Sequence, residues 1–345
     1  AQDSIPLFEQ KTIEGHAVRA TLFATGATAA ALENHSPEYI AAVSRLWDNM
    51  IGKRMFITGG VGAVHFDEKF GPDYFLPTDA YLETCAAVGA GFFSQRMNEL
   101  TGDAKYMDEL ERTLYNNVLT GISLSGTQYT YQNPLNSAKH ARWSWHDCPC
   151  CPPMFLKMMS AMPGFIYSQK GSDVYVNLFV GSETEMTLAD RNRVRLTQKT
   201  GYPWEGVVSM TVEPEKEKTF ILKVRIPGWA QGVENPYGLY RSEVRSAVSL
   251  KVNGKSVPLK IFKGYAEIQR KWKKGDQVEL TLPVQPRLVT ANEAVADLQD
   301  KVAIAAGPFV YCLEGCDNEG LADLKVDMRS PLSITFEIIE WNQCN

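Results

Sequence analysis

The spacing of apolar residues divides the chain into a helical part and a part built from β-strands. Through about residue 166, apolar residues recur every three to four positions, which is the period of an amphipathic helix. Ser36-Pro37, Thr101-Gly102-Asp103 and Pro163-Gly164 interrupt this pattern with residues that end or start helices. The pattern predicts helices over residues 15–36, 39–50, 85–100, 104–119 and 154–162.

From Asp173 onward, apolar and polar residues alternate with a period of two, which is typical of half-buried strands. Turn signals such as Asn253-Gly254 separate the alternating segments. Strands are predicted over 174–180, 207–212, 219–226, 247–252, 265–271, 277–282 and 302–313, and a short one over 129–131. We therefore expect an α+β multidomain chain, with a helical domain over residues 1–168 and an all-β sandwich region of one or two modules over 169–345.

Composition narrows the class of protein. The 345 residues are 44% hydrophobic, which is enough for real cores, and the net charge is -5 with acids and bases interspersed. No basic surface for nucleic acid is indicated, and no run of eighteen apolar residues predicts a membrane span. The cysteine count of seven is odd, so we expect no disulfide framework, although Cys312 and Cys316 are close enough in sequence to pair, leaving Cys344 without a role.

The strongest chemical signal is a cysteine cluster. Cys148, Cys150 and Cys151 fall within four positions, and Glu83 and Cys85 lie some sixty residues earlier. Thiolates and a carboxylate that converge can hold one borderline-soft metal ion, and zinc fits this ligand set best. A purely structural zinc knot, or buried cysteines that never meet, are the alternatives, because this spacing is not that of a zinc finger.

Local structure bears on this cluster. Pro152-Pro153 suits the first turn of a helix, so Cys150 and Cys151 are expected at a helix N-terminus, where the partial positive charge favours thiolates. Glu83 and Cys85 are two residues apart, which places their side chains on one side of an extended segment but on opposite sides of a helix. If both bind one ion, regular helix should begin only around Cys85.

A loop over residues 65–79 concentrates acids and aromatic residues just before Glu83. A carboxyl that protonates a glycosidic oxygen, beside flat apolar rings, is what a sugar site needs, whereas a solvated acidic loop is the alternative. His16, His65, His140 and His146 are further candidate site residues. The glycines of residues 59–62 lack the lysine-serine pair of a phosphate loop and are interpreted as turn glycines.

A series of motifs resembles the β-L-arabinofuranosidases of glycoside hydrolase families 127 and 146, in the same order along the chain. The motifs are residues 15–20 (GHAVRA), 57–62 (ITGGVG), 75–79 (FLPTD), 81–85 (YLETC), 111–117 (ERTLYNN), 131–135 (YQNPL), 148–153 (CPCCPP), 175–178 (YVNL) and 226–230 (IPGWA). The resemblance implies part of an (α/α)6-barrel catalytic domain followed by β-sandwich modules. It also implies that the front half of the barrel is absent from this sequence, and that half would be a partner of the chain.

The same resemblance implies roles for individual residues. Zinc would be held by Glu83, Cys85, Cys150 and Cys151. Cys150 would be the nucleophile and Glu68 the general acid/base, with Asp67 as the fallback because the sequence is one residue shorter between Glu68 and Glu83. His16 matches a histidine that contacts substrate, and Tyr131 matches a tyrosine that lines the site.

The function so implied is that of a retaining glycosidase that releases terminal β-L-arabinofuranose from plant-type glycans, in a bacterial periplasm or cytoplasm. A non-catalytic carbohydrate-binding protein with a structural zinc site is the first alternative. The second is an inverting hydrolase that uses two loop carboxylates such as Asp67 and Asp79.

Overall fold

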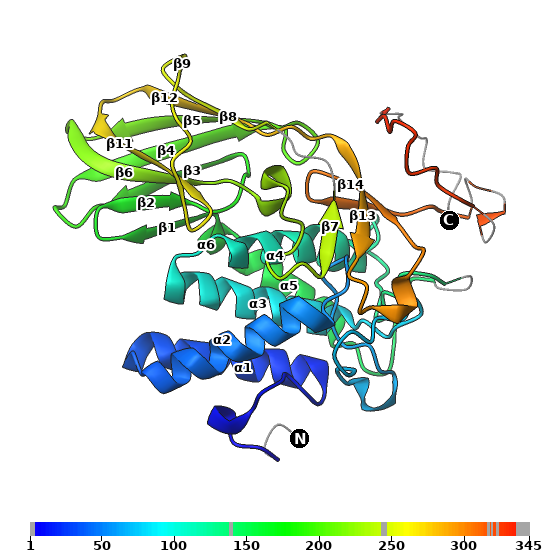
Figure 1. The fold of residues 1–345 in the computed structure, drawn as a ribbon. Coiled ribbons are helices and arrows are strands. Elements are labelled where there is room, and N and C mark those ends of the chain that lie inside the picture. Colours follow the sequence, from blue (N-terminus) through cyan, green and yellow to red (C-terminus); the bar gives the residue numbers. More distant parts are fainter. Residues whose placement is uncertain are drawn as a thin grey trace.

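The computed structural model describes residues 4–137, 141–242, 247–315, 318, 320–321 and 324–335, and Figure 1 shows helices below two stacked sheets. The helices are α1 (Ala17–Asn34), α2 (Pro37–Asn49), α3 (Thr84–Thr101), α4 (Lys105–Thr113), α5 (Cys151–Ala161) and α6 (Pro163–Ile166). Among the described helices, none has both the length and the apolar character that crossing a membrane requires.

Small residues bring α1 and α3 close together. α1 buries a stripe of alanines and threonines, and a side-chain methylene at Gly89 of α3 would lie only 2.1 Å from the hydroxyl of Thr21. That hydroxyl instead hydrogen-bonds to the carbonyl of Ala17 one turn earlier, at 2.9 Å. The small side chains of α1 therefore allow the two helices to pack closely. The helix predicted over 15–36 is confirmed, and it spans Ala17–Asn34.

The predicted helix over 104–119 is only partly correct. α4 ends at Thr113, and the chain continues in wider turns over Leu114–Val118 and in a tighter turn over Leu119–Gly121. The buried Asn116 side chain donates to the carbonyl oxygens of Arg112 and Pro308 and accepts from the backbone N–H of Val310. Asparagine side chains that bond to nearby backbone groups compete with regular helix, which periodicity alone does not reveal.

The strands form three sheets. The five-stranded sheet has the order β1-β2-β6-β11-β10, the six-stranded sheet β3-β4-β5-β12-β8-β9, and the four-stranded sheet β15-β14-β13-β7. The bounds are β1 Tyr167–Lys170, β2 Asp173–Val176, β3 Ser182–Thr187, β4 Arg193–Thr200, β5 Val207–Pro214, β6 Lys218–Arg225, β7 Tyr240–Ser242, β8 Ser249–Val252, β9 Lys255–Ser256, β10 Ile261–Phe262, β11 Tyr265–Trp272, β12 Asp276–Thr281, β13 Pro286–Ala291, β14 Ala303–Ala306 and β15 Phe309–Tyr311.

The two larger sheets share one hydrophobic core, so they form a sandwich, as predicted. Its members include Val174 and Leu222 on one sheet and Leu196, Met210 and Leu280 on the other. The alternation along β4 buries every second side chain, although the many charged residues of β3 and β4 hid these strands from the sequence prediction.

Three strand predictions need correction. The strand predicted over 174–180 ends as β2 at Val176, and residues 177–180 belong to no strand. The segment 302–313 is not one strand but a hairpin of β14 and β15, because Gly307 adopts a positive φ of 54° between them. Residues 129–131 form no strand. Tyr129 makes isolated bridges to Ile122 and Trp143, which hold this segment as an ordered loop.

The four-stranded sheet lies against the helical part, to the right of the sandwich in Figure 1. Its Val289 and Tyr240 share a core with Phe56, Leu76 and Leu82 from the loops between α2 and α3. Both glycines with positive φ in these loops, Gly59 and Gly62, occur where the chain leaves no room for a side chain: a methyl group at Gly59 would lie 2.5 Å from the Thr113 backbone. This agrees with the interpretation of turn glycines.

A buried ion network joins the β part to α4. The guanidinium of Arg225, at the end of β6, is fully buried and contacts the carboxylates of Asp108 and Glu111. Nearby, Glu234 forms an ion pair with the buried side chain of Arg287. Desolvating these charges is costly unless each has a partner, so the network fixes how the sheets sit on the helices.

Candidate active site

The cysteine pair and the Glu83 segment are brought together because α3 packs against α5. Gly91 of α3 faces Met158 of α5, whose side chain is completely buried, and a methyl group at Gly91 would lie 2.7 Å from the end of that side chain. The N-terminal ends of both helices carry the cluster, since α3 begins at Thr84 and α5 begins at Cys151.

The residue before α3 has extended backbone, as the two-residue spacing required. Glu83 has φ -61° and ψ 135°, and helix begins one residue later. The N–H of Thr84 donates to the carbonyl of Tyr131 at 2.9 Å, and Glu83 forms a bridge with Gln132. The expectation that regular helix begins around Cys85 is thus confirmed, and the loop over 129–133 fixes where Glu83 points.

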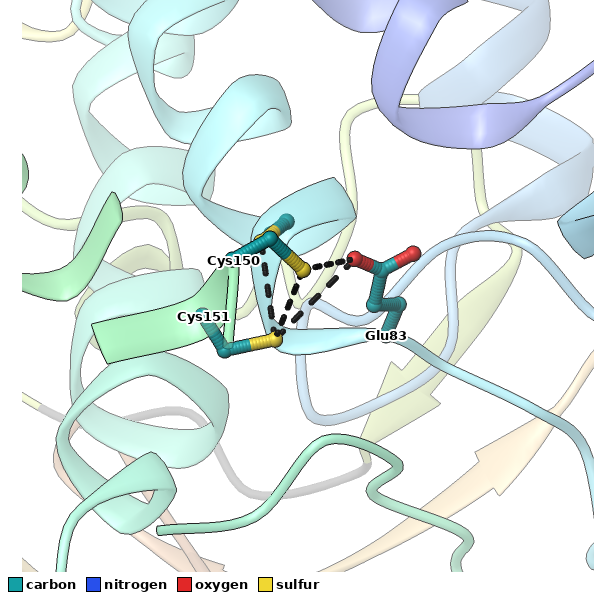
Figure 2. Close-up of side chains that lie close together, drawn as sticks. Glu83, Cys150 and Cys151 are labelled. Carbon is teal, nitrogen blue, oxygen red and sulfur yellow. Dashed lines mark hydrogen bonds between the residues drawn. The ribbon is translucent and has the colours of Figure 1, made fainter. Parts of the chain in front are cut away.

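Four side chains converge on one point. Sγ of Cys85 lies 3.4 Å from Sγ of Cys151, which lies 3.8 Å from Sγ of Cys150. Oε1 of Glu83 lies 3.3 Å from the Cys150 sulfur and 4.0 Å from the Cys151 sulfur. Figure 2 shows Glu83, Cys150 and Cys151 facing one another, with the other carboxylate oxygen of Glu83 directed away from the sulfurs.

These distances fit a metal centre and not a disulfide. Ligands of a tetrahedral zinc ion, with sulfur about 2.3 Å and oxygen about 2.0 Å from the metal, lie about 3.5 to 3.8 Å from one another. A disulfide would need sulfurs about 2.05 Å apart, and these cysteines are free. The ligand atoms of all four residues lie within 4.8 Å of one another, so Glu83, Cys85, Cys150 and Cys151 could hold one metal ion.

Electrostatics single out Cys150 within this group. Hydrogen bonds from the thiols of Cys151 and Cys85 lower the pKa of Cys150 far below that of a free thiol. The same interactions with Cys150 raise the pKa of Cys85 and Cys151. Burial and the neighbouring Cys150 raise the pKa of Glu83 to about 8. Cys85, Cys151 and Glu83 are almost fully buried, whereas Cys150 is only half-buried, so the most readily ionised sulfur is also the most accessible of the four.

Glu68 lies beside this cluster and contacts the side chains of one histidine and two tyrosines. Its Oε2 is 2.8 Å from Nε2 of His16, and its Oε1 accepts hydrogen bonds from the hydroxyls of Tyr81 at 2.6 Å and Tyr131 at 3.5 Å. The backbone of Glu68 has φ 51°, and the next residue, Lys69, bridges to both Val64 and His16. A non-glycine residue held in this sparsely populated region is typical of functional loops.

The fallback residue and the inverting pair lie elsewhere. Asp67 forms an ion pair with Lys69 at 2.7 Å and is 56% exposed, so its carboxylate is engaged at the surface and not with His16 and Tyr81. Asp79 is also exposed, and its backbone carbonyl, not its carboxylate, faces His65. Neither aspartate is positioned with the cysteine cluster, which gives no support to an inverting pair of these two residues.

The remaining candidate residues from the sequence, the other histidines and cysteines, differ in where they lie. His65 packs edge-on against Tyr81, with ring centroids 5.3 Å apart. His146 stacks on Trp143 at 4.5 Å and lies 5.2 Å from the ring of Tyr131, and these three rings form an aromatic wall that we call the Trp143 wall. His140, Cys316 and Cys344 lie outside the described residues, and Cys148 and Cys312 are free and exposed.

Two features of the site were missed by sequence reasoning. Tyr81 was noticed only as part of a motif, and the stacking of Trp143 was not foreseen. The position of Tyr81 two residues before Glu83 was not a usable signal, because Leu82 between them adopts φ 46° and breaks the alternation of an extended segment.

Three family models match consecutive segments of the chain, and all three describe domains of one glycoside hydrolase family. A family model described as the β-L-arabinofuranosidase GH127 catalytic domain matches residues 1–164, one described as the GH127 middle domain matches 173–284, and one described as the glycoside hydrolase family 127 C-terminal domain matches 286–339. The chain belongs to glycoside hydrolase family 127. Of the two families that the motifs resembled, this is the one found.

Individual members of family 127 are similar over nearly the whole chain. A non-reducing end β-L-arabinofuranosidase of Bifidobacterium longum subsp. longum is 31% identical in an alignment 337 positions long that covers 92% of this chain and 48% of the relative. A solved GH127 β-arabinofuranosidase is 41% identical with a TM-score of 0.88, covering 91% of this chain and 50% of that one. A GH127 β-L-arabinofuranosidase from Geobacillus stearothermophilus T6 is 38% identical with a TM-score of 0.85, covering 92% and 50%. The chain thus spans about half the length of these relatives.

Proposed function

We propose that the chain provides the nucleophile, the acid/base and the metal ligands of a retaining β-L-arabinofuranosidase. The observation that carries this proposal is the cluster of Glu83, Cys85, Cys150 and Cys151, in which the half-buried Cys150 has the lowered pKa. Glu83 is shared between this cluster and a second group that contains His16 and Glu68. Cys150, the proposed nucleophile, and Glu68, the proposed proton donor, therefore both lie next to the carboxylate of Glu83.

The donor set favours zinc as the ion. Zinc binds both thiolate sulfur and carboxylate oxygen, and ligands as soft as thiolates disfavour magnesium or calcium. When bound, zinc would keep its sulfur ligands in the thiolate form. Glu83, Cys85, Cys150 and Cys151 are the residues that would hold it.

The chain's own residues can carry out both steps of retaining hydrolysis. The Cys150 sulfur attacks the anomeric carbon of the terminal sugar, and Glu68 gives its proton to the leaving glycosidic oxygen as the bond from carbon to oxygen breaks. A thioether bond then links the sugar to Cys150. In the second step Glu68 takes a proton from a water molecule, which attacks the same carbon and releases both the sugar and the thiolate.

The neighbours of Glu68 position it for this work. His16 and Tyr81 each contact a different carboxylate oxygen, so the carboxyl cannot rotate freely. His16 would also contact the sugar, and Tyr131, the ring of the Trp143 wall whose hydroxyl reaches Glu68, would line the sugar site. Aromatic faces suit the C–H surface of a sugar, so the substrate proposed is a glycan that ends in β-L-arabinofuranose.

Residues 1–168 are proposed as the C-terminal half of an (α/α)6 barrel, and 169–345 as its β-sandwich region. In support, large apolar side chains on the helices are exposed, including Leu156 on α5 (65%) and Phe23 on α1 (39%). An N-terminal half of the barrel that packed on these helices would cover such residues. Hydrogen exchange of α1 and α5, with and without that half, tests this: the proposal requires slower exchange when it is present.

Mass spectrometry with a cysteine-reactive arabinofuranose analogue tests the function most directly. A covalent adduct on Cys150 is expected, and Cys150→Ser should abolish release of arabinose from an aryl β-L-arabinofuranoside while the protein remains folded. Cys85→Ser should lose the metal as well. A normal rate of hydrolysis by Cys150→Ser contradicts the nucleophile assignment. Sugar binding with neither turnover nor adduct would favour the carbohydrate-binding alternative.

A further inference from the structure

A second group of metal-ligating atoms lies next to the cysteine cluster. His16, Glu68 and Glu83 each offer one ligand atom, and these atoms lie within 4.8 Å of one another. The closest pair, Nε2 of His16 and Oε2 of Glu68, is 2.8 Å apart. At this distance the two atoms form an ion pair, whereas two nitrogen or oxygen ligands of a tetrahedral ion at about 2.0 to 2.2 Å lie about 3.3 to 3.6 Å apart, so the pair would open by about 0.5 to 0.8 Å to receive a cation.

An unsatisfied oxygen points to a ligand at this position. Glu83 is only 3% exposed, and its Oε2 has no hydrogen-bond partner within the described part of the chain. Figure 2 shows that one Glu83 oxygen faces the sulfurs and the other is directed away from them. A buried carboxylate oxygen without a partner is costly, and the cysteine cluster satisfies only Oε1. Oε2 therefore remains available to a ligand from outside that cluster.

We propose that His16, Glu68 and the free oxygen of Glu83 form a second, inhibitory site for a divalent cation. One imidazole and two carboxylates prefer ions such as Zn²⁺ or Mn²⁺, in contrast to the thiolate-rich first site. Glu83 would bridge the two sites with one oxygen in each. The second site has only three protein ligands, two of them partly exposed, so it binds zinc more weakly than the first.

Occupancy of this site has a chemical consequence that rests on the proposed function. A cation on Glu68 replaces the proton that this residue must give to the leaving oxygen, and a cation on His16 removes a sugar contact. Zinc would then have opposite effects at two concentrations. The first equivalent supports activity, and excess zinc stops it.

Metal titration of the chain, without any activity measurement, tests the site itself. After metal removal, Zn²⁺ should bind in two equivalents by calorimetry and native mass spectrometry, the second more weakly. With Co²⁺, only the first equivalent should produce a sulfur-to-metal charge-transfer band. His16→Ala and Glu68→Gln should each lose the second equivalent and keep the first. His65→Ala is the matched control, since His65 is nearby but outside the group, and it should bind two.

The outcomes separate the two proposals. A wild-type stoichiometry of one with an intact charge-transfer band, or two equivalents retained by His16→Ala, overturns the second site. If two equivalents bind but excess Zn²⁺ leaves arabinofuranoside hydrolysis unchanged, the inhibitory role is wrong. If the protein with one equivalent hydrolyses no arabinofuranoside in the presence of the N-terminal half of the barrel, the proposed function fails, whereas the two-equivalent binding result stands independently.

Discussion

The hydroxyl of Tyr81 donates a 2.6 Å hydrogen bond to Oε1 of Glu68, the residue proposed as the acid/base. Tyr81 is 7% exposed, and burial, followed by its hydrogen bond to Glu68, raises its pKa well above the usual range of a phenol. The phenol therefore stays protonated and is the donor of this hydrogen bond. Together with His16 on the other oxygen, it fixes the orientation of the carboxyl.

Tyr81→Phe should lower kcat with little change in metal content. The variant removes one hydrogen bond to a charged group, worth about 1.5 to 3 kcal/mol, so the rate should fall about ten- to a hundredfold if the bond persists in the transition state. Steady-state kinetics and metal analysis check this. Tyr129→Phe is a matched control, because the Tyr129 hydroxyl has no hydrogen-bond partner within the described residues. Equal losses in both variants would refute a positioning role for Tyr81.

Zinc uptake should release protons and become tighter as pH rises from about 6 to 8. In the metal-free protein the pKa of Glu83 is about 8 and those of Cys85 and Cys151 are raised, so these three groups are protonated near neutral pH, whereas Cys150 is ionised. A metal ion must displace those protons. Calorimetry in buffers of different ionisation enthalpy measures the number released. Glu83→Gln should release fewer, and uptake with no proton release would be inconsistent with this site.

The loop that carries Glu68 should lose its anchor in acid. Asp73 accepts hydrogen bonds from Asn49, Lys53 and Arg54. Against the opposing effect of burial, these bonds, that of Lys53 foremost, lower its pKa to about 2. Because the folded pKa lies below the unfolded value of 3.8, the stabilisation is present above pH 4 and is lost as pH falls toward 2.

Comparison of the wild type with Asp73→Asn isolates this contribution. The shift corresponds to about 2 kcal/mol, and partial exposure of Asp73 reduces the expected difference in unfolding free energy to about 1 kcal/mol at pH 6. The difference should shrink between pH 4 and 2, as measured by denaturant unfolding. A difference that is independent of pH would show that the asparagine acts through packing and not through charge.

Arg225→Met should destabilise the chain strongly. It would leave the carboxylates of Asp108 and Glu111 without their buried cation, and removing one partner of a buried pair costs about 3 to 5 kcal/mol. Denaturant unfolding of the variant gives this value. Arg193→Met is the control: Arg193 also pairs with two acids, but on the exposed face of β4, so its loss should cost less than about 1 kcal/mol. Similar losses at both positions would argue against a special role for the buried network.

The sequence was sufficient for those features that depend on local pattern. Helical spacing located α1 to α3, and alternation located β5, β6, β11 and β12. The spacing of Glu83 and Cys85 anticipated where α3 begins, because an extended residue before a helix is a local requirement. The convergence of Glu83 with the cysteine pair could be proposed from chemistry and from motifs resembling a known family.

Features that depend on tertiary contacts could not be predicted from the sequence. Leu82 adopts φ 46°, which breaks the regular alternation of an extended chain, so spacing alone could not establish that Tyr81 reaches Glu68. The end of α4 depends on Asn116, whose partners Pro308 and Val310 lie nearly two hundred residues away. The strands β3 and β4 were missed because their exposed faces carry so many charges.

The buried guanidinium of Arg225 has a consequence for how this architecture can be rearranged. Three family models divide the chain at about residues 170 and 285, yet Arg225 of the middle segment has both of its acidic partners in the first. In a chimaera that combined the helical part of one relative with the sandwich of another, the buried cation and its two acidic partners would come from different proteins and need not match. Modular exchange of these segments should therefore succeed only when α4 is exchanged along with β6.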